Sequence, residues 1–355
     1  MTQTSKSRTA RVRRITLKDI AGMAGVSVST ASLVLAGKSA DRRISREVEE
    51  RVRDIAVRHD YNPNLLVKSM QRGRTHVLAF YSAFRRRERN DLYMDRLSTA
   101  ILRGAGERGY DVLTYCDFSR PTGDIYRHIN GGLADGLVFF GPYESDPLLP
   151  LLRESRLPVV LLLHEDAEDK LCSVVEDVRE GIRRIAVALV DQGHRRIAAA
   201  ISPPGDLTDS HRRLALLRAS LASLGVSLPD EMVAPISDDD RYPAEDALRR
   251  WMALPEPPTA LFCWHDRLGY RILEACDRLN LRIPQTLSLI GYDGLHWPSL
   301  SSHVLTSVAV DIDAAASAAL GMLDGLINGE SPLERTILLP VRWEEGTTFG
   351  PAPHP

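Results

Sequence analysis

The 355-residue sequence has little cysteine and no long apolar run. Its four cysteines never form a Cys-x-x-Cys pair, so neither a zinc site nor a disulfide framework is predicted. No apolar stretch reaches the length of a membrane span, and residues 1–14 are polar and basic, without the apolar core of an export signal. We therefore expect a cytoplasmic protein whose cysteines are buried, reduced thiols: Cys116, Cys172, Cys263 and Cys276.

Motifs of the common enzyme classes are also missing. No Gly-x-Gly-x-x-Gly follows an expected strand, and there is neither a Walker glycine loop nor a Gly-x-Ser-x-Gly elbow. The acidic pairs at 165–166 and 176–177 lie in expected loops, without a context that would assign acid and base roles. The sequence predicts no catalytic residue, no cofactor and no metal, and so a protein that is not an enzyme.

Charge is distributed unevenly along the chain. Residues 1–75 hold 16 Lys and Arg against 7 Asp and Glu, whereas the rest of the chain holds 29 against 40. A basic head on an acidic body is typical of a phosphate-binding module joined to a part that stays away from nucleic acid. This asymmetry favours a nucleic-acid-binding head over a three-helix bundle that binds nothing.

Helix signals are dense within that head. Thr16 is a candidate N-cap, Gly25 breaks the first helix, Ser27 is a candidate cap for a second helix that stops at 36–37, and Ser45 is a candidate cap for a third. The expected inner stripes are Leu17, Ile20, Ala21 and Ala24, then Ala31, Val34 and Leu35, then Val48, Val52, Ile55 and Ala56. Two short helices around a glycine turn predict a helix-turn-helix whose second helix enters the DNA major groove with Val28, Ser29, Ser32 and Leu33 outward.

The same segment resembles the DNA-binding head of the lactose/galactose repressor (LacI-type) family. The family pattern Thr-x-x-Asp-x-Ala-x-x-Ala-Gly-Val-Ser-x-x-Thr-x-Ser is matched by Thr16, Asp19, Ala21, Ala24, Gly25, Val26, Ser27, Thr30 and Ser32. The resemblance implies a transcriptional regulator, with a repressor favoured, that binds a pseudo-palindromic double-stranded DNA operator as a homodimer.

The resemblance continues into a hinge helix. Asn62 can cap this helix and Pro63 suits its first position. So short a helix is marginal alone, and we expect it to form when two subunits meet on DNA. Relatives insert a hinge leucine into the minor groove, and the matching residue here is Met70, whose unbranched side chain can also wedge between base steps. The alternative is that Met70 packs as ordinary linker.

Two positions of the reading helix depart from the family. Leu33 stands where many relatives carry arginine or histidine, and Ala36 stands where the pattern has asparagine. Bidentate reading of guanine needs a donor fork, whereas hydroxyls and methyl groups suit thymine contacts. We therefore predict half-sites with thymine contacts and no strong guanine requirement opposite Leu33.

Beyond residue 75, apolar runs alternate with segments of helical pattern, which predicts parallel sheets covered on both faces. About 280 residues exceed one comfortable core, so two α/β lobes are expected, with ligand between them at the strand ends. The family's body is a pair of doubly wound lobes resembling type I periplasmic binding proteins. The expected division is head 1–61, hinge and linker 62–75, first lobe 76–174 plus 309–336, and second lobe 175–308 plus 337–355. The expected strands are 77–81, 112–115, 136–140, 159–163, 197–201, 260–264 and 287–291.

The resemblance also implies an effector site. Arg213 falls in the family's arginine block, His265 replaces an amide that commonly contacts ligand, and Asp293 matches the aspartate after a strand-end aromatic. Asp209, one turn before Arg213, is expected to share the site, and Tyr93 replaces part of the family's Asn-Pro-Phe-Phe entry. A family aromatic maps to Asp239 or Tyr242, and Arg85, Arg86, Arg87 and Arg89 either attract an anionic effector or form a solvated loop. The effector is expected to be sugar-like.

Two alternatives belong to other classes. One is a solute-binding protein of the periplasmic type whose basic head does not recognise specific DNA. The other is an α/β enzyme tethered to DNA. Each proposed cleft residue also has an alternative in which it binds no ligand. Arg213 could be a solvated helix charge, Asp293 a turn residue at a strand end, and His265 a core histidine. DNA binding that resists random competitor would distinguish a regulator from a solute-binding protein. Turnover of a bound small molecule would indicate an enzyme.

Overall fold

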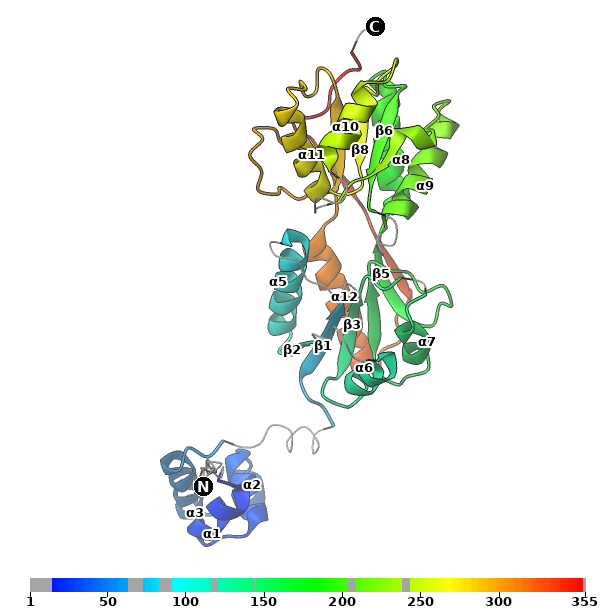
Figure 1. Ribbon diagram of the computed structural model, residues 1–355. Helices are drawn as coiled ribbons and strands as arrows, with labels where there is room; N and C mark the ends of the chain where they lie inside the picture. The colour runs from blue at the N-terminus through cyan, green and yellow to red at the C-terminus, as the bar shows by residue number, and fades with distance from the viewer. Residues whose placement is uncertain are drawn as a thin grey trace, which may run out of the picture. The chain divides into compact units, whose positions relative to one another are not determined.

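The computed structural model describes residues 15–62, 73–82, 91–115, 121–143, 145–203, 209–237 and 243–353, apart from the Asp41 side chain. It divides into two compact units, Met1–Thr75 and His76–Pro355, which are described separately. Both appear in Figure 1, the first in blue and the second from cyan to red. The hinge prediction for Met70, the arginines at 85–89, the positions 239 and 242, and Cys116 lie outside the described residues.

The first unit contains the three predicted helices. They are α1 (Leu17–Ala24), α2 (Val28–Leu35) and α3 (Arg46–Arg58), and a short 3-10 turn at Ala40–Arg42 was not predicted. The caps at Thr16, Ser27 and Ser45 are confirmed, because each side-chain oxygen accepts a hydrogen bond from a backbone N–H in the first turn of its helix. Gly25 has φ of 64°, the left-handed conformation that glycine adopts without steric cost.

The predicted stripes meet in one small core. Ile20, Ala31, Val34 and Val52 are fully buried, and Leu17, Leu35, Val48 and Ile55 pack around them partly buried. The three helices are therefore held together by their apolar faces, which pack against one another while the polar side chains face solvent.

Two sheets build the second unit, and each has six strands among the described residues. The first sheet runs β11-β5-β4-β3-β1-β2 and is wholly parallel. Its strands are β1 (Val77–Ser82), β2 (Asp111–Thr114), β3 (Gly136–Phe140), β4 (Val159–Leu162), β5 (Cys172–Glu176) and β11 (Thr336–Leu339).

The second sheet runs β12-β10-β9-β8-β6-β7, and β12 is antiparallel to β10. Its strands are β6 (Ile197–Ile201), β7 (Val233–Pro235), β8 (Ala260–Cys263), β9 (Ser288–Asp293), β10 (Thr306–Ala309) and β12 (Arg342–Glu344). All seven predicted runs are strands, whereas β5, β7, β10, β11 and β12 were not among them.

Helices cover both faces of the first sheet. Alternate residues of β1 and β3 point to opposite sides: Leu78 and Val138 pack with α5 (Leu92–Glu107) and α12 (Ile312–Ile327), while Ala79 and Leu137 pack with α6 (Thr122–Ile129) and α7 (Leu148–Arg153). In Figure 1 the cyan α5 and the orange α12 lie side by side, in agreement with their packing contacts. This is the period-two burial expected of a doubly covered sheet.

The second sheet has one continuous core. It is built with α8 (Val178–Asp191), α9 (Ser210–Ser223), α10 (Ala244–Met252) and α11 (Asp266–Arg278), and α8 packs on α9 as α10 packs on α11. Trp251, Phe262 and Tyr292 are its largest fully buried side chains. The three cysteines within the described residues, Cys172, Cys263 and Cys276, are buried free thiols.

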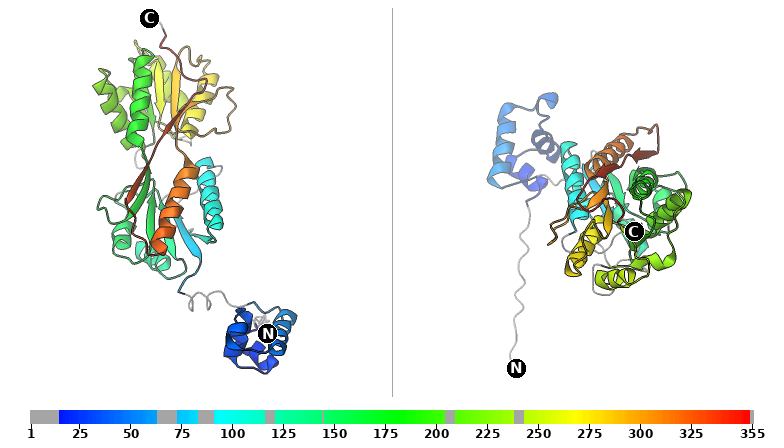
Figure 2. Two further views of the ribbon diagram at one scale, coloured as in Figure 1. Left: turned by 180° about the vertical axis from the view of Figure 1, so that it is seen from behind. Right: turned by 90° about the horizontal axis from the view of Figure 1, so that it is seen from above.

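The chain passes between the sheets at three described points. β5 of the first sheet leads to α8, β10 of the second leads to α12, and β11 of the first leads directly to β12 of the second. Figure 2 shows the last of these as the C-terminal strands running from one sheet to the other. The lobe boundaries expected at 174/175, 308/309 and 336/337 fall inside β5, β10 and β11.

Across the described residues, helices that combine enough length and enough apolar character to cross a membrane are lacking.

Candidate DNA-reading surface and effector cleft

The outward face of α2 is open to solvent. Val28 is 45% exposed and Ser29 is exposed, while Ser32 and Leu33 are partly exposed and the opposite side of the helix carries the buried Ala31 and Val34. An eight-residue helix with this division can place its outward side chains against base edges while its inner side holds it to α1 and α3.

Three of the predicted DNA-contacting residues also hold helix ends. Thr16 and Asp19 form a capping box, and Ser27 Oγ accepts from Thr30 N at 3.0 Å while the Ser27 and Thr30 hydroxyls are 2.8 Å apart. The caps orient the N-termini of α1 and α2, and helix N-termini favour phosphate. Contact of Thr16, Ser27 or Thr30 with DNA remains a prediction.

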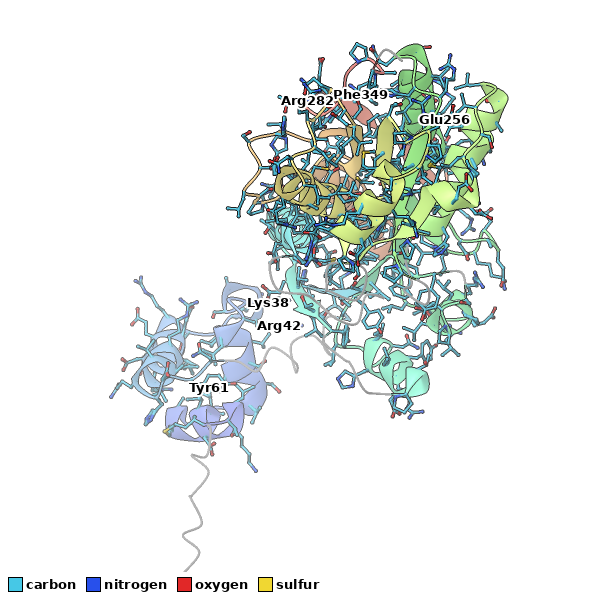
Figure 3. All side chains as sticks on the ribbon, turned by 45° about the horizontal axis from the view of Figure 1, so that its top comes forward. Lys38, Arg42, Tyr61, Glu256, Arg282 and Phe349 are labelled. Atoms are coloured by element: carbon cyan, nitrogen blue, oxygen red, sulfur yellow. The ribbon has the colours of Figure 1, made fainter. Side chains whose placement is uncertain are left out.

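Residues 15–62 of the head carry little of its excess of positive over negative charge. The arginines of α3 pair with acidic residues one turn away: Arg46 with Glu50, Arg51 with Glu47, Arg53 with Glu49 and Arg58 with Asp54. Lys18, Lys38, Arg42 and Arg43 are exposed, and Figure 3 labels Lys38 and Arg42, which follow the end of α2. The remaining surplus comes from residues 1–14 and 63–75.

Asn62 is exposed at the end of the described head, and its amide donates to Asp60 Oδ1 at 3.5 Å. The helix that it was predicted to cap, with Met70, lies outside the described residues.

In the second unit, Arg213 is the centre of a buried charged cluster. Its side chain is 7% exposed and lies on α9, with Nη1 donating to Trp264 O at 2.6 Å and to Asp293 Oδ1 at 3.2 Å, and Nη2 donating to Glu176 Oε1 at 3.2 Å. The guanidinium stacks over the Tyr292 ring, 3.8 Å from its centroid. The structure thus brings the predicted Arg213 and Asp293 into direct contact.

Glu176 was not predicted as part of the site. It ends β5 of the first sheet, is 6% exposed, and reaches Arg213 beside the second sheet, so the ion pair joins the two lobes. The available signal was its place at the end of an apolar run just before a helix cap, Asp177. The sequence predicts a loop at 176–177, because no strand is predicted at 172–176.

Tyr93 and His265 interact electrostatically with the cluster and belong to different lobes. Tyr93, near the start of α5, stacks on Phe140 at 5.9 Å, and burial together with Glu176 and Asp293 raises its pKa well above the usual value. His265 caps α11 by accepting from Leu268 N at 2.9 Å through Nδ1, and its ring lies 3.9 Å from that of Trp264. Burial lowers the pKa of His265 to about 3, so the ring is neutral.

Asp209 is exposed and has no described contact with Arg213 beyond the helix backbone, although its charge raises the pKa of Glu176 and Asp293. Burial is the larger cause for both carboxyls, and Arg213 opposes it. The pKa of Asp293 is raised to about 7. Despite burial, the carboxylates of Asp293 and Glu176 raise the pKa of Arg213, which stays charged.

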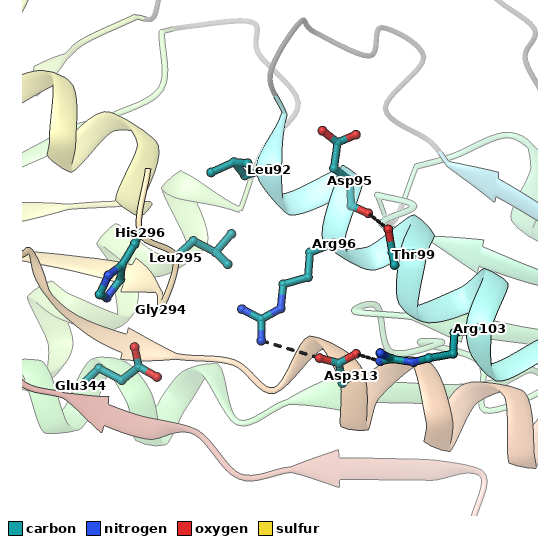
Figure 4. Close-up of a pocket in the computed structure, with 10 residues that line it drawn as sticks. All are labelled: Leu92, Asp95, Arg96, Thr99, Arg103, Gly294, Leu295, His296, Asp313 and Glu344. Atoms are coloured by element: carbon teal, nitrogen blue, oxygen red, sulfur yellow. Dashed lines mark hydrogen bonds and ion pairs between the residues drawn. The ribbon is translucent and has the colours of Figure 1, made fainter. Parts of the chain in front are cut away.

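The second unit also holds a pocket of about 700 Å³ (Figure 4). Its wall comes from α5 and α12, the turn after β9, and β12. Arg96 and Arg103 both pair with Asp313 there, and the side chains that line the pocket carry both signs of charge. Leu92 and Gly294 line it and are the sequence neighbours of Tyr93 and Asp293, whereas Arg213, Glu176 and Asp293 are not among its lining residues.

A compact head with an exposed reading helix, joined to a two-sheet body with a charged cluster where the sheets meet, defines a helix-turn-helix DNA-binding protein with a periplasmic-binding-type body. Residues 16–64 match the family described as bacterial regulatory proteins, lacI family, and residues 186–349 match the periplasmic binding protein-like domain. The chain thus combines a head that matches the lacI family with a body that matches the periplasmic binding protein-like domain.

Curated relatives and solved structures are similar to this chain over most of its length. The ribose operon repressor of Escherichia coli (strain K12) is 26% identical and covers 94% of this chain and 99% of its own length. The transcriptional repressor PurR of Pectobacterium carotovorum is 26% identical over 87% of this chain and 89% of its own. The lac repressor dimer bound to operator and the anti-inducer ONPF has a TM-score of 0.78 at 20% identity, with 95% and 99% coverage. The CelR–cellobiose complex has a TM-score of 0.66 at 23% identity, with 95% and 100% coverage.

Proposed function

We propose that this protein is a dimeric repressor. Its binding to a pseudo-palindromic operator changes when a small molecule binds between its lobes. The observation that carries the proposal is the pairing of an open reading face, Val28 and Ser29 on α2, with a cluster that ties the two lobes together through Glu176 and Arg213. The relatives, repressors of the ribose operon and of the PurR type, support the same role. The protein acts in the cytoplasm and catalyses no reaction.

Two heads are needed because one head makes few contacts with a half-site. Two heads on a palindrome double the phosphate contacts and place paired hinges together, and the lac repressor structure is a dimer on operator. DNA-binding roles for Thr16, Ser27, Val28, Ser29, Thr30, Ser32, Leu33, Asn62 and Met70 belong to this proposal.

The α5 helix offers little apolar surface for dimerisation. Met94, Leu97, Ile101 and Ala105 are already buried in their own lobe, and Leu102, 55% exposed, is the large apolar side chain left outside. A dimer contact along α5 would therefore combine Leu102 with charged neighbours.

Effector control follows from the position of the cluster. A ligand that engages Tyr93, Arg213, His265 or Asp293 competes with or extends the Glu176–Arg213 contact, and so has different affinities for the open and closed arrangements of the lobes. That difference is what an effector needs in order to change the DNA-binding state.

A mobility-shift assay tests the proposal. Full-length protein is incubated with the DNA upstream of its own gene, at two salt concentrations and with unlabelled random competitor. We expect a shift that survives competitor and weakens with salt. Binding that random competitor abolishes would contradict the regulator and favour the solute-binding alternative, and turnover of a bound small molecule would favour the tethered enzyme.

A further inference from the structure

Leu295 follows a strand of the second lobe but packs in the core of the first lobe. It comes directly after β9 in the chain, is 6% exposed, and lies among the apolar residues of the first lobe. That core includes Leu97 of α5 and Ile312 of α12. Figure 4 shows the Leu295 side chain extending from the turn after β9 toward α5. Because buried side chains are closely packed, Leu295 ties this turn to the first lobe.

The same turn begins at Asp293, which belongs to the charged cluster. Asp293 Oδ1 accepts a hydrogen bond from Arg213 Nη1 at 3.2 Å, and only Gly294 separates Asp293 from Leu295 in the chain. A displacement of Asp293 is therefore passed along a very short stretch of backbone to a side chain in the core of the first lobe.

The backbone of this turn is strained. Asp293 has a φ of 108°, which residues with a side chain rarely adopt. Gly294 has a φ of 73°, and a Cβ at this position would lie 2.3 Å from Ala309 Cβ, so the turn requires glycine there. Strain of this kind persists only where the surroundings fix the backbone, so the loss of a fixing contact favours a different conformation.

Hydrogen bonds hold the turn against the strand on which the chain crosses between the lobes. Gly294 N donates to Ser307 Oγ at 3.3 Å. Leu295 N donates to Asp266 Oδ2 at 2.6 Å, and Ser307 Oγ donates to Asp266 Oδ1 at 2.6 Å. Ser307 lies on β10, which leads to α12 of the first lobe. The turn therefore contacts the cluster, the crossing strand and the core of the first lobe.

We propose, resting on the proposed function, that the turn 293–295 couples the Arg213 cluster to the first lobe, with Leu295 as the positioning residue. When an effector changes the contact between Asp293 and Arg213, the strained turn relaxes and shifts Leu295 within the core of the first lobe. The first lobe begins directly after the hinge segment in the chain, so this shift is passed on to the DNA-reading head.

A double-mutant cycle tests the coupling on the full-length protein. Asp293→Ala takes the part of an effector by removing the Arg213 contact, and hydrogen exchange of the α5 and α12 amides reports on the first lobe. We expect Asp293→Ala alone to change these exchange rates at least about fivefold, and less than about twofold when Leu295→Ala is also present. Leu295→Met, which keeps an apolar side chain of similar volume, should preserve the response.

Leu289→Ala is the matched control. Leu289 is a fully buried leucine of β9 like its neighbours in the sheet, but it packs in the core of the second lobe. Its truncation should destabilise the protein and leave the response of α5 and α12 to Asp293→Ala intact. If Leu295→Ala does not fold, Leu295→Val, which removes one methylene, should reduce the response at least about twofold.

The coupling is contradicted if Asp293→Ala leaves the exchange of α5 and α12 unchanged, or if folded Leu295→Ala or Leu295→Val retains the full response. An equal loss of response in Leu289→Ala would also contradict it. Because hydrogen exchange needs no DNA, a lack of specific DNA binding would contradict the proposed function and leave the coupling standing. Specific DNA binding without the exchange response would contradict the coupling alone.

Discussion

Glu176 Oε1, at the end of a strand in the first sheet, accepts a hydrogen bond from Arg213 Nη2, on a helix packed against the second sheet, across 3.2 Å. This buried ion pair is a physical link between the two lobes at the place where the chain first crosses from one to the other. Any change to this ion pair is therefore expected to change how the two lobes are held together.

Removing Arg213 should destabilise the body strongly. Arg213→Met leaves Glu176 and Asp293 buried without their counter-charge, so we expect a loss of about 3–5 kcal/mol in the free energy of unfolding. Urea unfolding followed by tryptophan fluorescence measures it. Arg212→Met, at the exposed neighbouring position, is the control and should change stability by less than about 0.5 kcal/mol. Equal losses in the two variants would contradict a special role for Arg213.

Asp293 should give stability a distinctive dependence on pH. The pKa of its carboxyl is about 7 in the folded protein, against an ordinary value of 3.8. Between pH 3.8 and pH 7 the folded state therefore keeps a proton that the unfolded chain has lost. Its contribution to stability is therefore full below about pH 4 and is lost as pH rises through 7, with a slope of at most about 1.4 kcal/mol per pH unit.

Asp293→Asn removes that contribution, so the stability of the variant should fall less steeply between pH 4 and pH 7 than that of the wild type. Denaturant titrations at several pH values provide the comparison. Asp277→Asn, an exposed aspartate on α11, should leave the slope unchanged. The opposing trend from His265, whose lowered pKa adds stability as pH rises to its ordinary value, cancels in the comparison because it is present in every variant. Parallel curves for wild type and Asp293→Asn would disprove the assignment.

Substituting Ser27 and Ser29 should distinguish a residue that stabilises the reading helix from one that contacts DNA. Ser27 caps α2, so Ser27→Ala should destabilise the head by about 1 kcal/mol, seen as faster hydrogen exchange of α2 amides. Ser29 is exposed and outward, so Ser29→Ala should leave exchange unchanged and weaken operator binding. If Ser29→Ala also accelerates exchange, the outward position assigned to it is wrong.

Leu33 should leave the operator without a strong guanine requirement at the base pair that it faces. In vitro selection with wild-type protein is expected to return no invariant guanine there. Leu33→Arg adds a donor fork and should introduce a guanine preference of about 1–3 kcal/mol at that position alone. An invariant guanine with the wild-type protein would contradict the proposed contact.

Local signals account for what could be predicted well. The head was predicted helix by helix because each cap and its partner lie three residues apart, as Ser27 and Thr30 do. The central strands were predicted because their burial makes them continuous apolar runs, as in Gly136–Phe140. The strands that escaped prediction include short or edge strands such as β11, where Leu338 is 59% exposed and the apolar run is therefore no guide.

The site divides in the same way. Arg213 and Asp293 were proposed through the family resemblance, and the structure joins them at 3.2 Å. Glu176 could not be, because its partner lies 37 residues further along the chain on the other lobe, and no local pattern records that distance. His265 illustrates a third case, since its neutrality depends on burial rather than on its neighbours in sequence.

By itself the sequence determined the kind of protein: caps, glycine turn and apolar stripes specify a DNA-reading head, and the alternating body specifies two parallel sheets. Only the tertiary structure decided which acids share Arg213, because the pairing requires the end of β5 in one lobe and α9 beside the other to meet in space. Interactions within one turn of a helix can be predicted from residues that are close in sequence. The energy of a buried charge, in contrast, depends on every group that folding brings around it.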